Sequence, residues 1–210
     1  MLAKITSLLL ALGTATGADV YKHDDLRVQR WFKAEVRPEK RMIVDKVARK
    51  AILHKGRYQA IAKQSGCPWF VIAAIHNLEC SQSFSRHLHE GSSLKNRTRW
   101  HPRGRPLNGK PPFTFEESAL DALKYDKMGN VLWDRLFDLL WRVELYNGGG
   151  YWKYRGIPSP YLYSYTTVYS RGKYTSDGKY SSTAVSRQVG AAALWKALED
   201  KGEVDFSRLK

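Results

Sequence analysis

Apolar residues recur at helical spacing in three stretches of the chain, which predicts three amphipathic helices that share a core. The first stripe comprises Val44, Val47, Ala48, Ala51 and Ile52. The second stripe comprises Leu132, Leu136, Leu139, Leu140 and Val143, and the third begins with Val185, Val189, Ala192 and Trp195. We expect Gly56 to end the first helix in a left-handed conformation. The pattern predicts a mainly α fold with long loops and at most a small β element.

The stretch from Pro68 to Glu79 differs from these three because apolar residues occupy every side of it. Pro68 suits the first turn of a helix, and Gly66 ends a short polar helix before it. A helix that is apolar all round is expected to be buried on all sides. It would separate the Cα atoms of Cys67 and Cys80 by roughly 18–20 Å, at about 1.5 Å per residue. A disulfide needs about 7 Å or less, so we predict two unbridged cysteines.

The remaining segments suggest one domain with extensions at both ends. Residues 19–40 are charged and show no sustained apolar period, so we interpret them as a leader or linker. The domain spans 41–198, and a polar tail covers 199–210. Residues 86–112 hold three histidines and four prolines, which indicates a long loop.

Two local patterns refine this organisation. Thr114 and Glu117 form a capping box that starts the next helix. Farther along, Tyr161, Tyr163 and Tyr165 alternate in a way that suggests loop and some strand character.

The first 18 residues have the layout of a short secretory signal. Lys4 precedes an apolar run, and Thr16 and Ala18 stand where a signal peptidase prefers small residues. The run is shorter than the roughly 20 apolar residues that a membrane-spanning helix needs. The pattern predicts an exported protein, periplasmic or secreted, with no stable membrane span. An ordinary amphipathic helix start is the alternative interpretation.

The charge of the chain predicts a polyanionic partner. Lysine and arginine number 35 against 20 acidic residues, which gives a formal net charge of +15. Nucleic acid, an anionic membrane face and a bacterial wall all fit that charge. The region 151–180 interleaves nine aromatic residues with cations, a composition that can stack on single-stranded nucleic acid or line a saccharide groove. We expect at least four of the nine to serve packing instead.

Glu79 is the residue whose position most favours chemistry. A carboxyl group at the end of an apolar helix loses hydration, which favours its protonated form. A protonated carboxyl can donate a proton to a leaving glycosidic oxygen. Alternatively, Glu79 lies just past the buried part and is solvated or paired with an arginine. The histidines lack the spacing of a zinc site, so we predict no metal and no cofactor.

The residues around Glu79 resemble the lysozyme-like superfamily, in particular soluble lytic transglycosylases and goose-type lysozymes. The resemblance rests on Ala-Ile-His-Asn-Leu-Glu79-Cys-Ser81-Gln-Ser-Phe84 and on the later Tyr146-Asn147-Gly148-Gly149-Gly150. In that superfamily a hydrophobic helix ends in Glu-Ser, and a Tyr-Asn-Ala-Gly segment lines the same cleft. Residues 43–198 are similar to bacterial and phage lysozyme-family proteins of the endolysin type. The shared features include a Pro-Trp before the helix, a Gly-Arg-Pro, a Phe-Thr-x-Glu-Glu and a Ser-Pro-Tyr-Leu.

The resemblance implies a lysozyme-like α+β architecture and an enzyme that cleaves the β-1,4 bond between N-acetylmuramic acid and N-acetylglucosamine. It implies that Glu79 is the acid/base catalyst. The substrate-binding residues that we infer are Ser81, Tyr146, Asn147, Gly148, Tyr151 and Tyr161. The partners would be peptidoglycan glycan strands and the anionic wall surface, which disfavours nucleic acid. A non-catalytic module that binds nucleic acid or a wall polyanion is the alternative.

Two departures from the family pattern leave the reaction open. Cys80 separates Glu79 from Ser81, and the loop offers Glu90-Gly91 where the similar proteins have an acid after Asn-Gly. The candidates for a second carboxylate are Glu90, Glu116 and Asp121. A hydrolase needs such a second group. A lytic transglycosylase, which forms a 1,6-anhydro product, needs only one glutamate.

Overall fold

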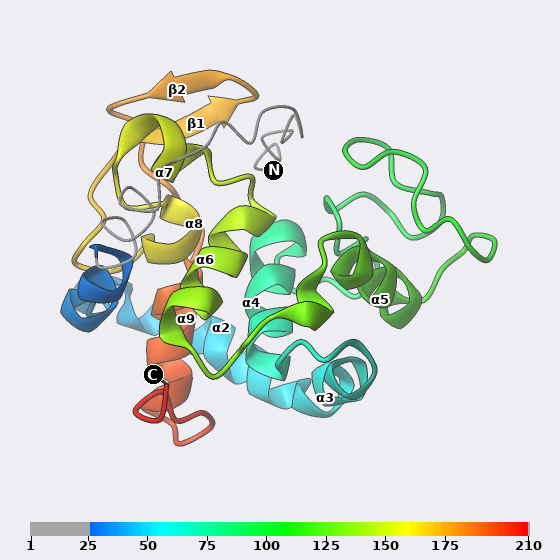
Figure 1. The fold of residues 1–210 in the computed structure, drawn as a ribbon, viewed down its shortest axis with the longest axis horizontal. Coiled ribbons are helices and arrows are strands. Elements are labelled where there is room, and N and C mark those ends of the chain that lie inside the picture. Colours follow the sequence, from blue (N-terminus) through cyan, green and yellow to red (C-terminus); the bar gives the residue numbers. More distant parts are fainter. Residues whose placement is uncertain (1–25, 210) are drawn as a thin grey trace.

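The computed structural model describes residues 26–209, which form a mainly helical domain with one small two-stranded sheet (Figure 1). The α-helices are α2 (Arg41–Leu53), α3 (Lys55–Ser65), α4 (Trp69–Cys80), α5 (Phe115–Tyr125), α6 (Leu136–Tyr146), α7 (Gly150–Arg155), α8 (Pro160–Tyr163) and α9 (Ala191–Glu199). Two short 3₁₀ helices are η1 (Pro38–Lys40) and η2 (Met128–Asn130). The strands β1 (Lys173–Ser176) and β2 (Lys179–Ser181) pair antiparallel, with Tyr174 opposite Tyr180.

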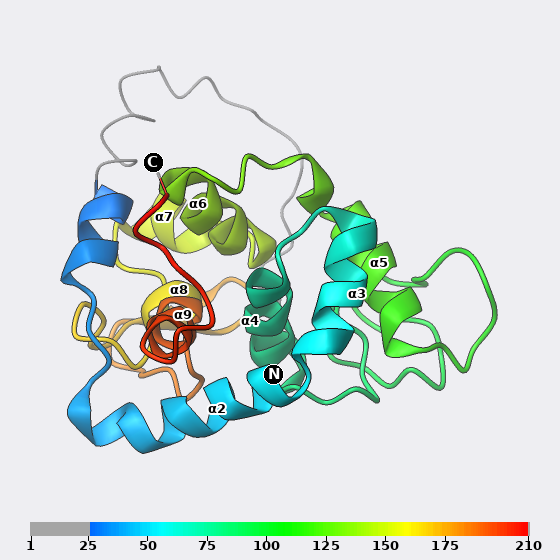
Figure 2. The same cartoon turned by 90° about the horizontal axis from the view of Figure 1, so that it is seen from below.

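Helix α4 occupies the middle of the domain, as the apolar stretch predicts. It lies between α6 and α9 on one side and α3 and α5 on the other (Figures 1 and 2). All residues from Val71 to Leu78 are buried, and so is Cys80. Cys67 and Cys80 stand at the two ends of this helix as buried cysteines that form no disulfide with each other, as predicted. Because α4 is central, it contacts α2, α3 and α9.

Helix α2 buries the predicted stripe, but Gly56 does not end it. Val44, Ala48 and Ala51 face α9 and the core. The helix ends at Leu53, and His54 turns the chain with φ −103° and ψ 13°, so no left-handed residue is needed. Gly56 is then the second residue of α3. The expected left-handed glycine stands one helix later, at Gly66 with φ 71°.

The other two stripes begin before their helices do. Leu132 is 61% exposed, and Val185 is exposed as well. Extended backbone at Arg135 and at Gly190 starts α6 and α9 later than the apolar spacing suggests. Periodicity therefore identified both helices and misplaced their first turns, because one apolar residue in a preceding loop can fall at helical spacing by coincidence.

The interpretation of residues 19–40 as a leader or linker is wrong for the part that the structure describes. Residues 26–33 are helical, and Trp31 is only 2% exposed. At the other end of the chain, Phe206 in the predicted polar tail is buried, and its ring lies 5.1 Å from that of Trp31. Both rings also contact Trp195 of α9. These segments each hold too few apolar residues to produce a period, yet those few enter the core.

The segment expected to alternate like a strand is partly helical. Tyr161 and Tyr163 belong to α8, whereas the two strands lie farther along the chain. Between α4 and α5, residues 86–112 contain no helix and no named strand, as predicted, and they extend outward next to α5 (Figure 1). Thr114 and Glu117 make both hydrogen bonds of the predicted capping box.

Two predictions concern membrane and export. Among residues 26–209, no helix has the length and apolar character to cross a membrane. The predicted secretory signal at residues 1–18 lies outside the described residues.

Candidate active site

Glu79 is the partly exposed residue at the end of a buried helix. From residue 71 to residue 80, every position of α4 is buried except Glu79. The helix closes at Ser81, which adopts the left-handed conformation with φ 52°. Glu79 therefore lies in the last turn of α4 and is half-buried. The sequence left open whether Glu79 is desolvated or lies just past the buried part, and the structure lies between these two alternatives.

Tyr161 contacts the Glu79 carboxyl directly. Its hydroxyl donates a hydrogen bond of 3.0 Å to Oε1 of Glu79. Burial and the nearby Glu79 charge raise the pKa of Tyr161 well above 10, so the hydroxyl remains a donor at any physiological pH. Pro160 begins α8 immediately before Tyr161, and this short helix directs the tyrosine inward.

Tyr146, the last residue of α6, also lies near Glu79. Its hydroxyl donates to the carbonyl oxygen of Leu88 at 3.1 Å. Burial raises the pKa of Tyr146 well above 10, and the negative charges of Asp126 and Glu79 raise it further. The structure thus brings together three predicted residues, Glu79, Tyr146 and Tyr161, from segments far apart in the sequence.

Asp126 is a carboxylate near this site that the sequence analysis missed. It follows α5 as the C-cap residue. Its charge raises the pKa of both Tyr146 and Tyr161, although its effect on Tyr161 is smaller than that of Glu79. No motif marks it, since an acidic residue after a helix is ordinary in sequence. Only the folded chain shows that α5 ends beside the two tyrosines.

Asn147 and Gly148 continue from Tyr146 into a tight turn. Asn147 is buried, and its backbone N–H donates to the carbonyl oxygen of Glu144. Gly148 and Gly149 have φ values of 92° and 65°, which side chains rarely adopt. The glycines therefore allow α7 to begin directly after α6. Asn147 and Gly148 therefore form the turn that follows Tyr146 at the end of α6.

Ser81 and Tyr151 make structural contacts away from the Glu79 carboxyl. The Ser81 carbonyl oxygen accepts a hydrogen bond from Nζ of Lys50 on α2, and the residue is exposed. Tyr151 is buried, and its hydroxyl accepts from the backbone N–H of Tyr174 at 3.0 Å. It therefore joins α7 to β1. Five of the nine aromatic residues in 151–180 are buried, which agrees with the packing role expected for at least four: Tyr151, Tyr161, Tyr163, Tyr169 and Tyr174.

Two of the three candidate second carboxylates are committed to arginines. Glu116 pairs with Arg57 at 2.8 Å on the surface. Asp121 accepts two hydrogen bonds from Arg105, at 2.7 and 2.9 Å, and another interaction at 2.8 Å from His89. Both carboxylates thus have a structural role in tying α5 to its neighbours.

Glu90 is the candidate whose neighbour in the chain, Gly91, packs against Glu79. It is 6% exposed, and its Oε1 accepts from the Ser92 hydroxyl and from the backbone N–H of Arg99. Its neighbour Gly91 has φ 79°, and a Cβ built there would lie 2.5 Å from the carbonyl oxygen of Glu79. The loop therefore packs tightly against the end of α4 at this point.

Buried histidines hold that loop in place. The ring of His87 bonds to the Ser118 hydroxyl at 2.8 Å and to the Asn96 carbonyl oxygen at 2.7 Å. His89 reaches Asp121 on the same helix, α5. The sequence predicted a long loop here. Two of its three histidines, His87 and His89, are fully buried and hydrogen-bonded, which holds this part of the loop against α5.

His76, one turn before Glu79 on α4, faces the core. Its Nδ1 lies 2.9 Å from the Tyr58 hydroxyl, and its ring packs 4.2 Å from that of Phe115. Burial lowers the pKa of His76 to about 4, so it is neutral under ordinary conditions. Within residues 26–209, no group of three or more histidine, cysteine or acidic side chains is arranged to hold a metal ion.

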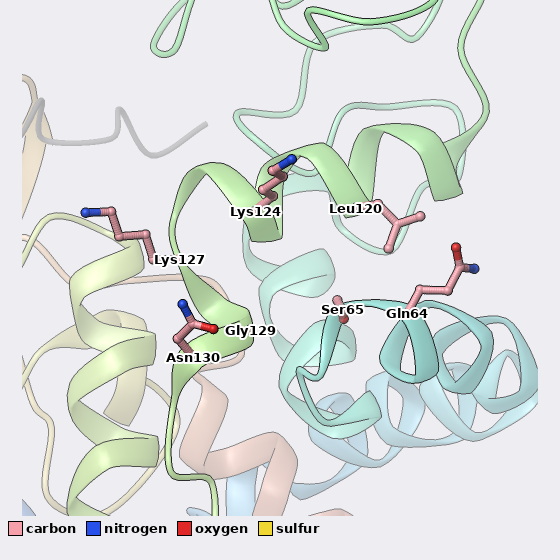
Figure 3. A pocket seen from close by; sticks show the side chains of 7 residues that line it. All are labelled: Gln64, Ser65, Leu120, Lys124, Lys127, Gly129 and Asn130. Carbon is pink, nitrogen blue, oxygen red and sulfur yellow. The ribbon is translucent and has the colours of Figure 1, made fainter.

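A separate pocket of about 410 Å³ lies between α3, α5 and η2 (Figure 3). It is lined by Gln64, Ser65, Leu120, Lys124, Lys127, Gly129 and Asn130. None of these side chains is a carboxyl or an imidazole, so the pocket offers no ordinary acid/base pair. Glu79 remains the stronger candidate for chemistry.

Comparisons of this chain with known proteins identify no relative. No family model matches the chain, and searches of curated proteins and of solved structures also give no match. The functional argument therefore depends on the residues and contacts described above.

Proposed function

We propose that this protein is a peptidoglycan-cleaving glycosidase, with Glu79 as the acid/base catalyst. The observation that carries the proposal is the contact between the Tyr161 hydroxyl and the Glu79 carboxyl. It joins the end of the buried helix to the Ser-Pro-Tyr-Leu segment, two of the elements on which the resemblance to the lysozyme-like superfamily rests. A carboxyl that is partly exposed and held by a permanent donor suits proton transfer to a bound sugar.

In the proposed reaction, Glu79 first donates its proton to the oxygen of the β-1,4 bond, and the N-acetylglucosamine side leaves with that proton. Glu79, now a carboxylate, then takes the proton of the C6 hydroxyl of the muramoyl residue. The C6 oxygen closes on C1 and gives a 1,6-anhydro product. Tyr161 fixes the carboxyl orientation throughout by donating to Oε1. The sequence consumes no water and restores Glu79 to its starting protonation state.

The surroundings of Glu79 favour this lytic transglycosylase route over hydrolysis. Hydrolysis needs a second carboxylate at about 5–9.5 Å, depending on its stereochemistry. Glu116 and Asp121 are paired with arginines. Glu90 is buried and bonded within its own loop. A route that needs one carboxyl therefore fits the site better.

The same proposal includes the wall as the place of action. A chain with 35 basic and 20 acidic residues is attracted to an anionic wall surface. Export of the protein, or its release from the host cell as an endolysin, would bring it to that substrate.

The decisive experiment is the Glu79→Gln variant in a turbidity assay on permeabilised Gram-negative cells. The amide keeps the shape but cannot cycle a proton, so we expect cleavage to fall by about 10²- to 10⁴-fold. Glu39→Gln is the matched control, because Glu39 is exposed on η1 and should leave the rate unchanged. Equal thermal melting of the three proteins would show that the fold is intact. A Glu79→Gln variant that clears cells at the wild-type rate would refute the assignment.

The products of digested sacculi distinguish the two reactions. Anhydro muropeptides, lighter by one water and without a reducing end, are the expected species in mass spectrometry. If every released muropeptide has a free reducing end, the protein is a muramidase. Glu90 is then the first candidate to test as its second carboxylate. Wall binding without any cleavage would favour the non-catalytic module.

A further inference from the structure

A pocket of about 240 Å³ lies between η1 and the segments that follow α8 and precede α9. Its lining includes three cationic side chains and three serines: Arg37, Lys40, Arg187, Ser164, Ser170 and Ser186. No carboxylate lines it. Within residues 26–209, none of its three cations makes an ion pair with an acidic side chain. The pocket therefore concentrates positive charge that the protein itself does not neutralise.

Two of the three cations, Arg37 and Lys40, make contacts that leave their charge available. Arg37 donates from Nε to the Thr166 carbonyl oxygen at 3.0 Å and from a terminal nitrogen to the Tyr169 carbonyl oxygen at 2.9 Å. Nζ of Lys40 lies 5.2 Å from the centre of the Tyr165 ring. Because these partners are neutral, they position Arg37 and Lys40 without neutralising their positive charge.

Tyr165 connects the parts of this pocket in an unusual backbone conformation. Its φ is +70°, which is rare and costly for a residue with a side chain. Its carbonyl oxygen accepts from the N–H of Arg37, and its hydroxyl donates to the carbonyl oxygen of Arg187 at 3.0 Å. Such strained positions persist where the surroundings determine them, and they cluster at binding sites.

The pocket is also linked to the end of α4. Ser164 directly follows α8, the helix that carries Tyr161. On the other wall, the segment after Ser186 is held to α4 by two hydrogen bonds. Asn77 donates to the Val189 carbonyl oxygen at 2.9 Å, and Gln188 donates to the Leu78 carbonyl oxygen at 2.8 Å. One wall of the pocket thus continues from α8, and the other is hydrogen-bonded to the last turns of α4.

We propose that this pocket binds a phosphate group. Guanidinium and ammonium groups with hydroxyl donors suit a tetrahedral oxyanion that carries more than one charge and several acceptor oxygens. A carboxylate has fewer oxygens than a phosphate and a single charge, so it would bind to the pocket more weakly. This binding goes beyond the proposed glycan cleavage. On a wall, the pocket would hold the phosphate of an anionic polymer while the sugar chain lies at Glu79.

The test is a titration of the full chain at low ionic strength with glycerol 3-phosphate, inorganic phosphate and glycerate. Calorimetry measures affinity, and NMR of the tyrosine rings locates the contact. The expected result is saturable binding of glycerol 3-phosphate that perturbs Tyr165, with glycerate at least tenfold weaker at equal ionic strength. Inorganic phosphate that binds more tightly than the ester would identify the free ion as the ligand and overturn the link to a polymer.

Two variants and a control test the residues themselves. Lys40→Gln and Arg187→Gln should each weaken glycerol 3-phosphate binding about tenfold. Lys110→Gln removes the same charge from the exposed loop far along the chain and should leave the affinity within twofold. Equal weakening by all three would mean general charge attraction and refute the pocket. Absence of saturable binding in the wild-type chain would refute it as well. Glu79→Gln should bind as tightly as the wild type, which separates this proposal from the catalytic one.

Discussion

Two regions enclose the end of α4, and they are built from different chemistry. The first, which we name the histidine side, comprises residues 87–91 and the groups on and beside α5 that hold them: Ser118, Asp121 and Arg105. The second, the tyrosine side, comprises Tyr146, Tyr161 and Tyr163 with their hydroxyl hydrogen bonds. On the histidine side Gly91 packs against the Glu79 carbonyl oxygen, and on the tyrosine side Tyr161 donates to the Glu79 carboxyl.

The two regions differ in the groups that make their hydrogen bonds. The histidine side relies on imidazole rings and on an aspartate–arginine pair. On the tyrosine side, burial raises the pKa of all three tyrosines above 10. Their hydroxyls therefore stay neutral donors from acid to moderately alkaline pH. Tyr161 therefore holds the Glu79 carboxyl with a hydroxyl that stays neutral, whereas residues 87–91 are held mainly through imidazole rings.

The largest expected effect tests how closely the histidine side approaches Glu79. Gly91→Ala introduces a methyl group against the Glu79 carbonyl oxygen at a φ of 79°. We expect a loss of about 3 kcal/mol in the free energy of unfolding, from overpacking and a left-handed alanine together. Gly104→Ala in the same loop has a φ of 80° and nothing within 4 Å, so it should lose only about 1 kcal/mol. Equal losses in urea unfolding would mean that the loop does not press on α4.

The next effect is a dependence of stability on pH at His76, which faces Tyr58 on α3 and Phe115 on α5. Burial lowers the pKa of His76 to about 4, whereas the unfolded chain protonates near 6.5. Between these values the unfolded state binds more protons, so stability falls as the pH falls, by up to about 3 kcal/mol. Arg57 and Lys50, which add positive charge nearby, act in the same direction.

Unfolding experiments from pH 7 to pH 4 measure how steeply the free energy of unfolding depends on pH. His76→Phe should flatten this dependence, while the exposed His101→Gln should leave it unchanged. NMR titration of the His76 ring gives the same answer if the phenylalanine variant fails to fold. A ring that titrates near 6.5 in the folded protein would contradict the expectation.

A smaller effect compares two acidic residues of α5. Asp121→Asn weakens the bidentate contact to Arg105 and the interaction with His89, both largely buried, and should cost about 2 kcal/mol. Glu116→Gln removes a surface pair with Arg57 and should cost less than about 1 kcal/mol. Chemical denaturation of both variants decides whether the histidine side depends on its aspartate. Similar small losses would show that the loop is held by other contacts.

The smallest effect on stability separates positioning from packing on the tyrosine side. Tyr161→Phe and Tyr163→Phe each remove one buried hydroxyl bond, and each should cost about 1 kcal/mol. Only Tyr161→Phe should lower the rate of wall cleavage, about tenfold, and alter its pH profile, because only that hydroxyl donates to Glu79. If both variants cleave with the wild-type rate and pH profile, Tyr161 has no positioning role.

The sequence was sufficient to predict much of the helical framework. The continuous apolar stretch predicted the buried α4, and the capping box predicted the start of α5 at Thr114. These are local signals, set by residues within one or two turns. The predicted helix end at Gly56 was wrong because a residue such as His54 can also close a helix, which spacing does not reveal.

The site was harder to predict because its contacts join distant segments. Glu79 and Tyr161 were singled out from motifs, but the bond between them depends on how α8 packs. Asp126 carries no motif at all. The loop histidines were noted only as lacking the spacing of a zinc site. The burial of His87 and His89 goes with single hydrogen bonds to Ser118 and Asp121, which no periodic pattern encodes.

The meeting of Trp31 and Phe206 has a consequence for the order of folding. The ring of Trp31 packs against Trp195 and Phe206, which are synthesised long after it. Contacts between residues so far apart in sequence raise the contact order and slow the search for the native state. A growing chain therefore holds residues 26–33 without these aromatic partners until α9 and Phe206 have emerged. Docking of this segment thus comes after the synthesis of the elements that lie between them in the sequence.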